Sequence, residues 1–330
     1  LEVTATTPAE AHAVVGAGYD VDNVRGNTLR IYASQEEVQR LKDAGYVVVE
    51  IERQPNPEKE LGAYHSYTSL VSDLQAYAAA HSDICRLSSI GTSYQGREIE
   101  ALLITDNPAV QEDEPEFAYM GSIHGDEPLG MEMCVYFIDR LLNGYGVEQR
   151  ITDLVDSTAI WVVPLINPDG LALNSRYNAQ GVDLNRSFAS YPTDFTGTLY
   201  DGAALNAAGR PPEVTKMMQW RAAQSIVLSA NLHGGALVVN YPYDYDGKPS
   251  GTDSPTPDDV LLEDVARRYS VHNAPMWNSP EFDDGITNGA VWYILIGGMQ
   301  DWCYRYLACT DFTIELSNSK RPSSSLIPSY

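Results

Sequence analysis

Residues 116–143 read EFAYMGSIHGDEPLGMEMCVYFIDRLLN, and this stretch contains the pattern that decides the fold. The apolar run Phe117–Ile123 predicts a buried strand. Pro128 stands where a first helical turn would begin, and Leu129–Asn143 predicts the helix that follows. A strand that leads through a short turn into a helix is the repeating unit of an α/β protein.

The same alternation of strands and helices continues on both sides of this stretch. It predicts an α/β fold in which a sheet is covered by helices on both faces. Further strands are predicted at residues 99–105, 159–166, 226–232 and 312–316, and further helices at residues 66–80 and 212–224.

Residues 1–52 are predicted to form a small separate α+β module of the strand-helix-strand type. Thr28–Ala33 alternates like a strand, Ser34-Gln35-Glu36-Glu37 is a capping box that begins a helix, and Val47–Ile51 is β-branched again. The polar residues 53–61 are the predicted linker to a large domain, residues 62–330. A folding aid or propeptide remnant, an accessory domain and an inhibitory cover are all open roles for the module.

Charge and hydropathy exclude two classes of partner. The formal net charge of -24 argues against nucleic acid, which attracts proteins through Lys and Arg. No apolar run approaches the length of a transmembrane helix, so we expect no membrane insertion. Leu1 is expected to follow a processed or trimmed end. The low content of Lys and Arg suits a secreted protein, extracellular or periplasmic, which we expect to be a monomer.

The four cysteines lack the paired spacing of a structural zinc site. One or two disulfides, with Cys303–Cys309 as a local pair, and buried free thiols at Cys85, Cys134, Cys303 and Cys309 remain alternatives.

Two short segments carry side chains that bind metals. His124-Gly125-Asp126-Glu127 follows one apolar strand, and Asn231-Leu232-His233-Gly234-Gly235 follows another. The carboxyl ends of strands are where an α/β sheet usually places its active site. Together the two segments offer two imidazoles and one carboxylate, the ligand set that leaves a catalytic zinc one open position for water. The sequence therefore predicts a hydrolase with one Zn²⁺ per chain, held by His124, Glu127 and His233.

A histidine that binds a metal normally donates its second ring nitrogen to a carboxylate or a carbonyl. Asp183 is the candidate partner for His124, because the segment around it holds other functional groups. Asp126 is its rival, although its position next to the ligand turn favours a side chain that points away.

Several ordered motifs resemble the zinc metallocarboxypeptidases, and their wording looks most like the N/E (regulatory) branch of that family. The resemblance covers about Leu61 to the C-terminus and implies a mixed eight-stranded sheet, a catalytic domain over residues 62–330, and peptide or protein C-termini as partners. The matching segments are Ile90–Ile99, Gly121–Gly130, Asn167–Gly170, Ser175–Phe188, Ser229–Asp244 and Thr287–Leu316.

The resemblance also implies roles for single residues. His124, Glu127 and His233 fall on the zinc ligands. Glu315 falls on the carboxylate that takes a proton from water and passes it to the leaving amine. Arg176 falls on the arginine that polarises the scissile carbonyl.

On the substrate side, Asn185 and Arg186 fall on the pair that grips the terminal carboxylate, for which a guanidinium fork is well suited. Tyr293 falls on a mobile tyrosine that closes over the bound residue. Asp244 and Gln300 fall on the polar lining that selects a C-terminal Lys or Arg in the N/E branch. Asp244 also lies in the turn-rich acidic segment Tyr243–Gly247, where Asp is common for local reasons.

The resemblance is incomplete at the C-terminal end of the large domain. The N/E branch usually continues into a small transthyretin-like β domain, and a helix is expected after the last catalytic strand, whereas this sequence stops at Tyr330. A trimmed chain or a bacterial-type member would account for both. The leading expectation is a zinc carboxypeptidase that prefers C-terminal Lys or Arg. A cell-wall peptide amidase of the same family and a catalytically inactive binding relative are the alternatives.

Overall fold

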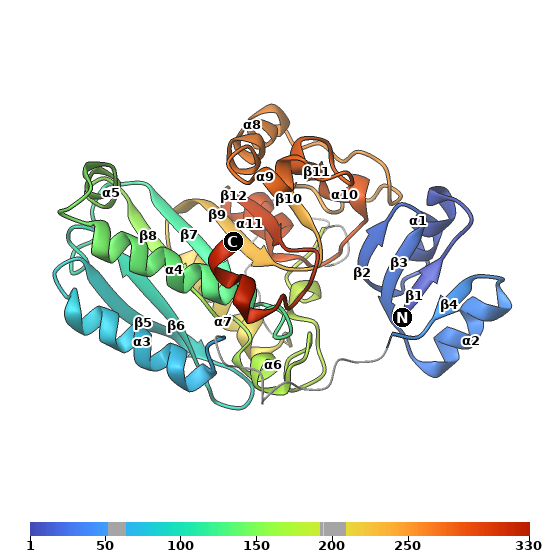
Figure 1. Cartoon of the computed structure of the whole chain (residues 1–330), viewed down its shortest axis with the longest axis horizontal. Coiled ribbons are helices and arrows are strands. Elements are labelled where there is room, and N and C mark those ends of the chain that lie inside the picture. The colour runs from blue at the N-terminus through green and yellow to red at the C-terminus, as the bar shows by residue number, and fades with distance from the viewer. Residues whose placement is uncertain (52–63, 192–193, 195–208) are drawn as a thin grey trace.

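The computed structural model describes residues 1–51, 64–191, 194 and 209–330, which form a large unit and a small N-terminal module (Figure 1). The predicted linker at 53–61 lies outside the described residues. The large unit contains an eight-stranded sheet of order β11-β10-β12-β9-β7-β8-β6-β5, and the module a four-stranded sheet of order β2-β3-β1-β4.

The large sheet is mixed, as predicted. Its central strands β12, β9, β7 and β8 are parallel, and the pairs β10·β12, β6·β8 and β5·β6 are antiparallel. The strands are β5 (Cys85–Thr92), β6 (Glu98–Ile104), β7 (Glu116–Gly121), β8 (Ala159–Val163), β9 (Ile226–His233), β10 (Leu237–Tyr241), β11 (Ile286–Asn288) and β12 (Thr310–Leu316).

Helices cover both faces of this sheet, and the side chains of a strand alternate between two buried cores because successive residues point to opposite faces. On β8, Ile160 and Val162 lie in one core with residues of α3, α4, α5 and α8, whereas Trp161 and Val163 lie in the other with residues of α7 and α11. The helices are α3 (Tyr67–Ala80), α4 (Leu129–Gly144), α5 (Gln149–Val155), α6 (Pro168–Leu173), α7 (Pro212–Ala223), α8 (Asp259–Ser270), α9 (Ala274–Trp277), α10 (Gly289–Trp292) and α11 (Met299–Leu307), with the 3-10 turns η1 (Leu184–Arg186), η3 (Asp283–Gly285) and η4 (Ser324–Ser329).

The module is larger than the predicted strand-helix-strand unit. Its elements are β1 (Glu2–Thr4), α1 (Pro8–Gly16), β2 (Asp20–Arg25), β3 (Thr28–Tyr32), α2 (Gln35–Asp43) and β4 (Val47–Val49). The capping box at Ser34 and Glu37 is present. The prediction missed the first half of the module, where β1 has only three residues and α1 is capped by Thr7.

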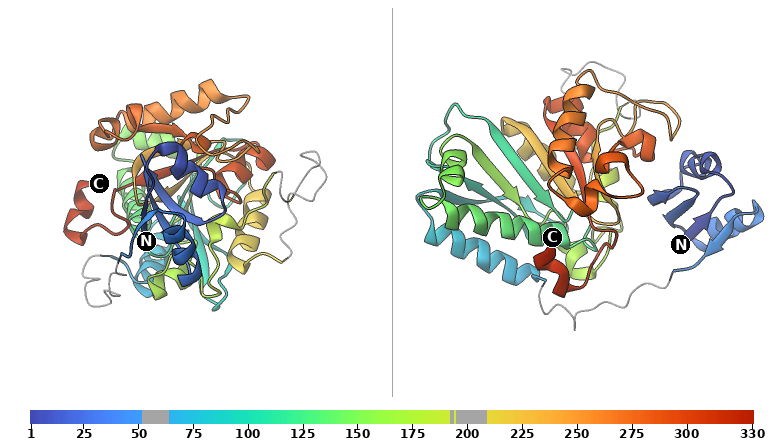
Figure 2. Two further views of the ribbon diagram at one scale, coloured as in Figure 1. Left: turned by 90° about the vertical axis from the view of Figure 1, so that its right-hand side faces the viewer. Right: turned by 45° about the horizontal axis from the view of Figure 1, so that its top comes forward.

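The module packs against the large unit instead of standing apart from it. Figures 1 and 2 show it beyond one end of the large sheet, with β2 as its nearest strand. Its apolar core continues into Trp292, Tyr293 and Leu295 of the large unit. Side chains of the large unit therefore form part of the apolar core of the module.

All four cysteines are buried free thiols, so the disulfide alternative does not hold in this structure. Among the described residues, no helix is both long enough and apolar enough to cross a membrane.

Candidate active site

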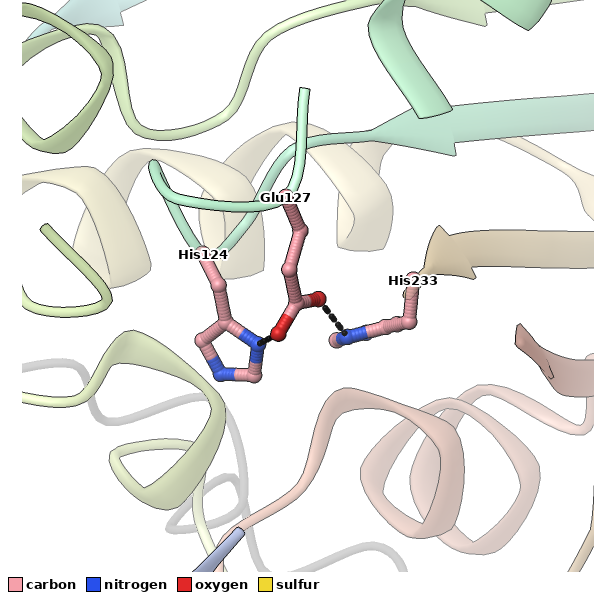
Figure 3. A group of neighbouring side chains, drawn as sticks. All are labelled: His124, Glu127 and His233. Carbon is pink, nitrogen blue, oxygen red and sulfur yellow. Dashed lines mark hydrogen bonds and ion pairs between the residues drawn. The ribbon is translucent and has the colours of Figure 1, made fainter. Parts of the chain in front are cut away.

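The two imidazoles and the carboxylate predicted to bind a metal come together at the carboxyl ends of β7 and β9. One candidate ligand atom from each of His124, Glu127 and His233 lies within 4.8 Å of the others. The two oxygens of Glu127 lie 3.1 Å from His124 Nδ1 and 3.0 Å from His233 Nδ1. Figure 3 shows the three side chains pointing at one another, two from the loop after β7 and one from the end of β9.

The loop after β7 is held in place by close backbone packing. Ser122 adopts a positive φ of 48°, and its hydroxyl donates to the backbone carbonyl of Glu127 at 3.0 Å. A Cβ on Gly125 would lie 1.9 Å from the backbone carbon of Gly170, so only glycine fits there. Gly125 in the His124–Glu127 segment is thus required by the approach of α6.

The donor set fits a zinc ion. Ligand atoms about 2.1 Å from a tetrahedral zinc stand about 3.4 Å apart. Here the imidazole nitrogens lie 3.1 and 3.0 Å from the two oxygens of Glu127, and the three candidate ligand atoms lie within 4.8 Å of one another. All three side chains are buried, and burial of such a polar cluster favours a bound cation that satisfies it. Two Nδ1 atoms and one carboxylate would leave a fourth position open.

Asp183, and not Asp126, accepts a hydrogen bond from the second ring nitrogen of His124. The distance from His124 Nε2 to Asp183 Oδ1 is 3.2 Å, and the other oxygen of Asp183 accepts Arg176 Nε at 2.8 Å. Burial opposes the negative charge of Asp183, but Arg176 and His124 hold its pKa well below the usual range. Asp126 instead lies 3.6 Å from Lys320 Nζ.

Glu315 lies on β12, directly opposite His233 of β9 in the strand register. The side chain is buried, and within the described part of the chain its Oε2 is a buried oxygen without a hydrogen-bond partner. Burial, followed by the nearby charge of Glu127, raises the pKa of Glu315 to about 8. A carboxyl group with such an oxygen beside a metal-binding cluster is suited to exchange protons with a bound molecule.

Arg176 lies at the same cluster, and its guanidinium group donates a hydrogen bond to Asp22 of the N-terminal module. Its Nη1 is 3.2 Å from His124 Nδ1 and donates to Asp22 Oδ1 at 2.9 Å. The sequence reasoning missed Asp22, whose burial opposes ionisation while the charges of Lys320 and Arg176 lower its pKa below the usual value. Asp22 lies in β2, whose four middle residues are all buried, and no local signal in the sequence marks it, because its partners come from the large unit.

Module contacts also reach two of the residues predicted to bind substrate. Arg186 Nη2 donates to the carbonyl oxygen of Val21 at 2.8 Å, and the Tyr293 hydroxyl donates to that of Asp22 at 3.2 Å. Asn185 lies next to Arg186 on η1, and its Oδ1 accepts Met299 N at 3.0 Å.

Asp244 and Gln300 lie together, as predicted, and a third residue supports them. Asp244 Oδ1 accepts Gln300 Nε2 at 3.2 Å, and burial raises the pKa of Asp244 to about 7. The carboxylate of Asp301 accepts the backbone amides of Asp244 and Tyr245 at 2.8 and 3.0 Å. Asp301 was missed, although it directly follows Gln300.

A single pocket joins most of these side chains. It brings the candidate metal ligands, the buried carboxyl group of Glu315 and the cationic groups of Arg176 and Arg186 into one space with Asp22 of the module. Its lining is Asp22, His124, Glu127, Arg176, Asn185, Arg186, His233, Gly234, Asn240, Trp292, Tyr293, Leu295, Thr313 and Glu315.

Comparison with known sequences finds a match for most of the chain. A family model described as zinc carboxypeptidase matches residues 70–330. Carboxypeptidase D of Mus musculus is 38% identical over 286 residues, covering 81% of this chain and 20% of that protein. The catalytic chain of carboxypeptidase N of Mus musculus is 38% identical over 291 residues, covering 78% of this chain and 64% of that one. The chain thus spans only part of the length of these relatives.

Two solved structures share the fold over nearly the whole chain. Carboxypeptidase A from Helicoverpa armigera has a TM-score of 0.77 at 18% identity and covers 99% of this chain and 92% of its own. Thrombin activatable fibrinolysis inhibitor has a TM-score of 0.67 at 19% identity and covers 99% of this chain and 93% of its own. Coverage of 99% includes the N-terminal module, which lies outside the match to the family model.

Proposed function

Because the chain belongs to the zinc carboxypeptidase family, we propose that it is a zinc-dependent exopeptidase that removes single residues from peptide C-termini. Its sequence relatives, carboxypeptidases D and N among them, place it in the N/E branch. One observation carries the proposal. Glu315, whose buried Oε2 has no hydrogen-bond partner among the described residues, lies across from His233 in the pocket that also holds His124 and Glu127.

The chemistry follows from the positions of the side chains. A zinc ion held by His124, Glu127 and His233 would supply a Lewis acid and make a water molecule more acidic. Glu315 takes a proton from the attacking water and delivers it to the leaving amine, since its buried Oε2 has no hydrogen-bond partner among the described residues. Arg176 donates to the scissile carbonyl oxygen as negative charge develops there.

The residues around Arg186 decide which peptide bond is cut. Arg186 and Asn185 hold the terminal carboxylate of the substrate, and an internal peptide bond offers no such group. Tyr293 closes on the bound residue with its hydroxyl group. At present Arg186 and Tyr293 both donate to backbone carbonyls of the module, so their hydrogen-bonding groups already point into the pocket.

The module is best explained as an inhibitory cover, the third of the roles left open by the sequence. Asp22 lines the pocket, Val21 accepts from Arg186, and Asn23 Nδ2 donates to Gly235 O at 2.8 Å beside the metal-binding cluster. A substrate needs the same donors. Tests of activity therefore use the full chain with a specific protease site placed between Ile51 and Tyr64, before and after cleavage; the second form is called the cut chain.

Metal content gives the first prediction. The chain should bind one Zn²⁺, and chelation should abolish hydrolysis of acyl-Arg, acyl-Lys and acyl-Phe substrates by the cut chain. His124→Ala should lose the ion, because one of three protein ligands is gone. Metal analysis and thermal unfolding with and without zinc check this, since an ion that binds only the folded chain raises its stability. Stoichiometric zinc binding by the His124→Ala variant would contradict the ligand assignment, and the Asp126→Asn variant is the matched control.

Specificity gives the second prediction, which rests on a preference for C-terminal Lys or Arg. Asp244→Asn keeps the shape of the pocket but removes the charge that pairs with a cationic side chain. A hydrogen bond to a charged group is worth about 1.5–3 kcal/mol. The ratio of kcat/KM for acyl-Arg over acyl-Phe should therefore fall about 10- to 100-fold, at ~1.4 kcal/mol per tenfold. An unchanged ratio would refute the role of Asp244. Asp253→Asn, which changes an exposed acid nine residues further along the chain, should leave the ratio unaltered.

We further propose that the protein acts as a secreted monomer, extracellular or periplasmic. Its acidic composition, with a net charge of -24, supports a soluble surface that repels nucleic acid. Fractionation of the source cells and light scattering of the purified chain test these two statements.

A further inference from the structure

One oxygen atom at the edge of the metal-binding cluster is held by two cationic groups. Asp22 Oδ1 lies 2.9 Å from Arg176 Nη1 and 2.6 Å from Lys320 Nζ. Asp22 and Arg176 are buried, and the side chain of Lys320 is only 14% exposed. The family resemblance gave Arg176 a role but gave none to Lys320, which follows Glu315 by five residues.

Both cations also touch the predicted metal ligands. Lys320 Nζ lies 3.0 Å from Glu127 Oε1, and Arg176 Nη1 lies 3.2 Å from His124 Nδ1. The two donors therefore approach Asp22 Oδ1 from the sides of two different ligands. An anionic oxygen placed there is next to the point where a metal ion would bind.

The contacts of the neighbouring backbone indicate what this oxygen stands for. The carbonyl oxygen of Val21 is held by Arg186, the residue proposed to grip a terminal carboxylate. In a peptide whose terminal carboxylate is held there, the scissile carbonyl lies one residue towards the N-terminus. The oxygen of that carbonyl would lie nearer the metal-binding cluster than the terminal carboxylate does. Asp22, the residue after Val21, likewise places its Oδ1 on two cations that contact that cluster.

We propose that Lys320 is a second cationic donor, with Arg176, to the scissile carbonyl oxygen; this rests on the proposed exopeptidase function. The oxygen is neutral in the substrate. It gains a full negative charge when water adds to the carbonyl carbon. When the C–N bond breaks and the amine takes the proton, it becomes part of the new carboxylate of the shortened peptide. Two cations bind the charged oxygen more tightly than the neutral one, so they lower the barrier.

Charge balance within the described residues supports this assignment over a purely structural role. Asp126 lies 3.6 Å from Lys320 Nζ, farther than either Asp22 or Glu127. Removal of the module takes away Asp22, and a metal ion would draw the charge of Glu127 to itself. Of its three acidic partners among the described residues, Lys320 then keeps Asp126 at 3.6 Å, and a developing oxyanion would replace the contact with Asp22.

The test compares Lys320→Met, Lys320→Arg and the remote control Lys216→Met in the zinc-loaded cut chain. Loss of one oxyanion donor costs about 100-fold or more in kcat, so Lys320→Met should show that loss with KM changed only a few-fold. Lys320→Arg should recover part of it, and Lys216→Met should match the wild type. Zinc content and circular dichroism establish that each variant is loaded and folded.

A second readout does not need turnover. The shortened product, an acyl-glycine with a free carboxylate, should bind Lys320→Met more weakly than the wild type in a calorimetric titration. Unchanged kcat and unchanged product affinity in Lys320→Met would overturn the proposal. A loss confined to KM for substrates with an acidic penultimate residue would also overturn it, because Lys320 would then bind a side chain. A wild-type cut chain without turnover would refute the proposed function itself.

Discussion

Replacing Glu315 with Gln should reduce kcat of the cut chain by about 1,000-fold while zinc and peptide still bind. General acid–base catalysis by a positioned side chain contributes about 100- to 10,000-fold. The amide has the shape of the carboxyl group but cannot accept and return a proton. Substrate binding depends on other groups, Arg186 and Asn185 among them, so KM should change little.

The same substitution should stabilise the metal-free chain, which separates the chemical role of Glu315 from a structural one. Burial and the charge of Glu127 raise the pKa of Glu315 to about 8. Because the pKa of Glu315 is higher in the folded chain than in the unfolded chain, the free energy of unfolding falls as the pH rises above the unfolded-state pKa. A neutral Gln does not titrate, so this loss of stability is absent in the variant. Thermal unfolding of the metal-free Glu315→Gln variant at pH 7 should show a higher Tm than the wild type.

The matched control is Glu112→Gln, an exposed Glu far from the pocket, which should leave kcat and Tm unchanged. Wild-type kcat in a zinc-loaded Glu315→Gln variant would show that another group moves the proton.

Releasing the N-terminal module should have the second largest effect. The uncut chain should hydrolyse acyl-Arg poorly, and cleavage between Ile51 and Tyr64 should activate it. Asp22→Ala should raise the activity of the uncut chain by about 100- to 4,000-fold. Breaking a buried ion pair by removing one partner costs ~3–5 kcal/mol, and ~1.4 kcal/mol corresponds to a factor of ten in the closed-to-open ratio. The activity of the cut wild type sets the ceiling.

Asp43→Ala, an exposed acid on α2 of the same module, is the matched control and should leave the uncut chain covered. An uncut, zinc-loaded wild type as active as the cut chain would contradict the inhibitory role. The module would then be an accessory domain or a folding aid.

The sequence predicted the parts of the fold whose patterns are local. Phe117–Ile123 and Leu129–Asn143 appear as β7 and α4, and the capping box at Ser34 begins α2. In the large sheet, β5, β10 and β11 were not predicted. β10 and β11 have five and three residues and lie among turns, and in β5 the alternation is broken at Ser88-Ser89, next to the bulge at Gly91.

The residues of the site likewise divide into those that a local sequence pattern marks and those that only the folded structure brings together. His124 and Glu127 could be recognised because they lie three residues apart in one turn after a strand. Asp22 could not, since its partner Arg176 is 154 residues away and only the packing of the module brings them together. Lys320 is similar. Its partners Asp22 and Glu127 come from other elements, and no local pattern marks a lysine after a strand as part of a site.

The way the module packs makes its affinity depend on its covalent attachment. It is held by a few buried polar contacts and by an apolar core shared with Trp292 and Tyr293. Within one chain the effective concentration of module around the pocket is of millimolar order, as expected for a short tether. After cleavage that advantage disappears, and the fragments should separate on dilution. Inhibition by the module would then depend on its covalent attachment. The cleaved enzyme would be covered by the module at high protein concentration and active at low protein concentration.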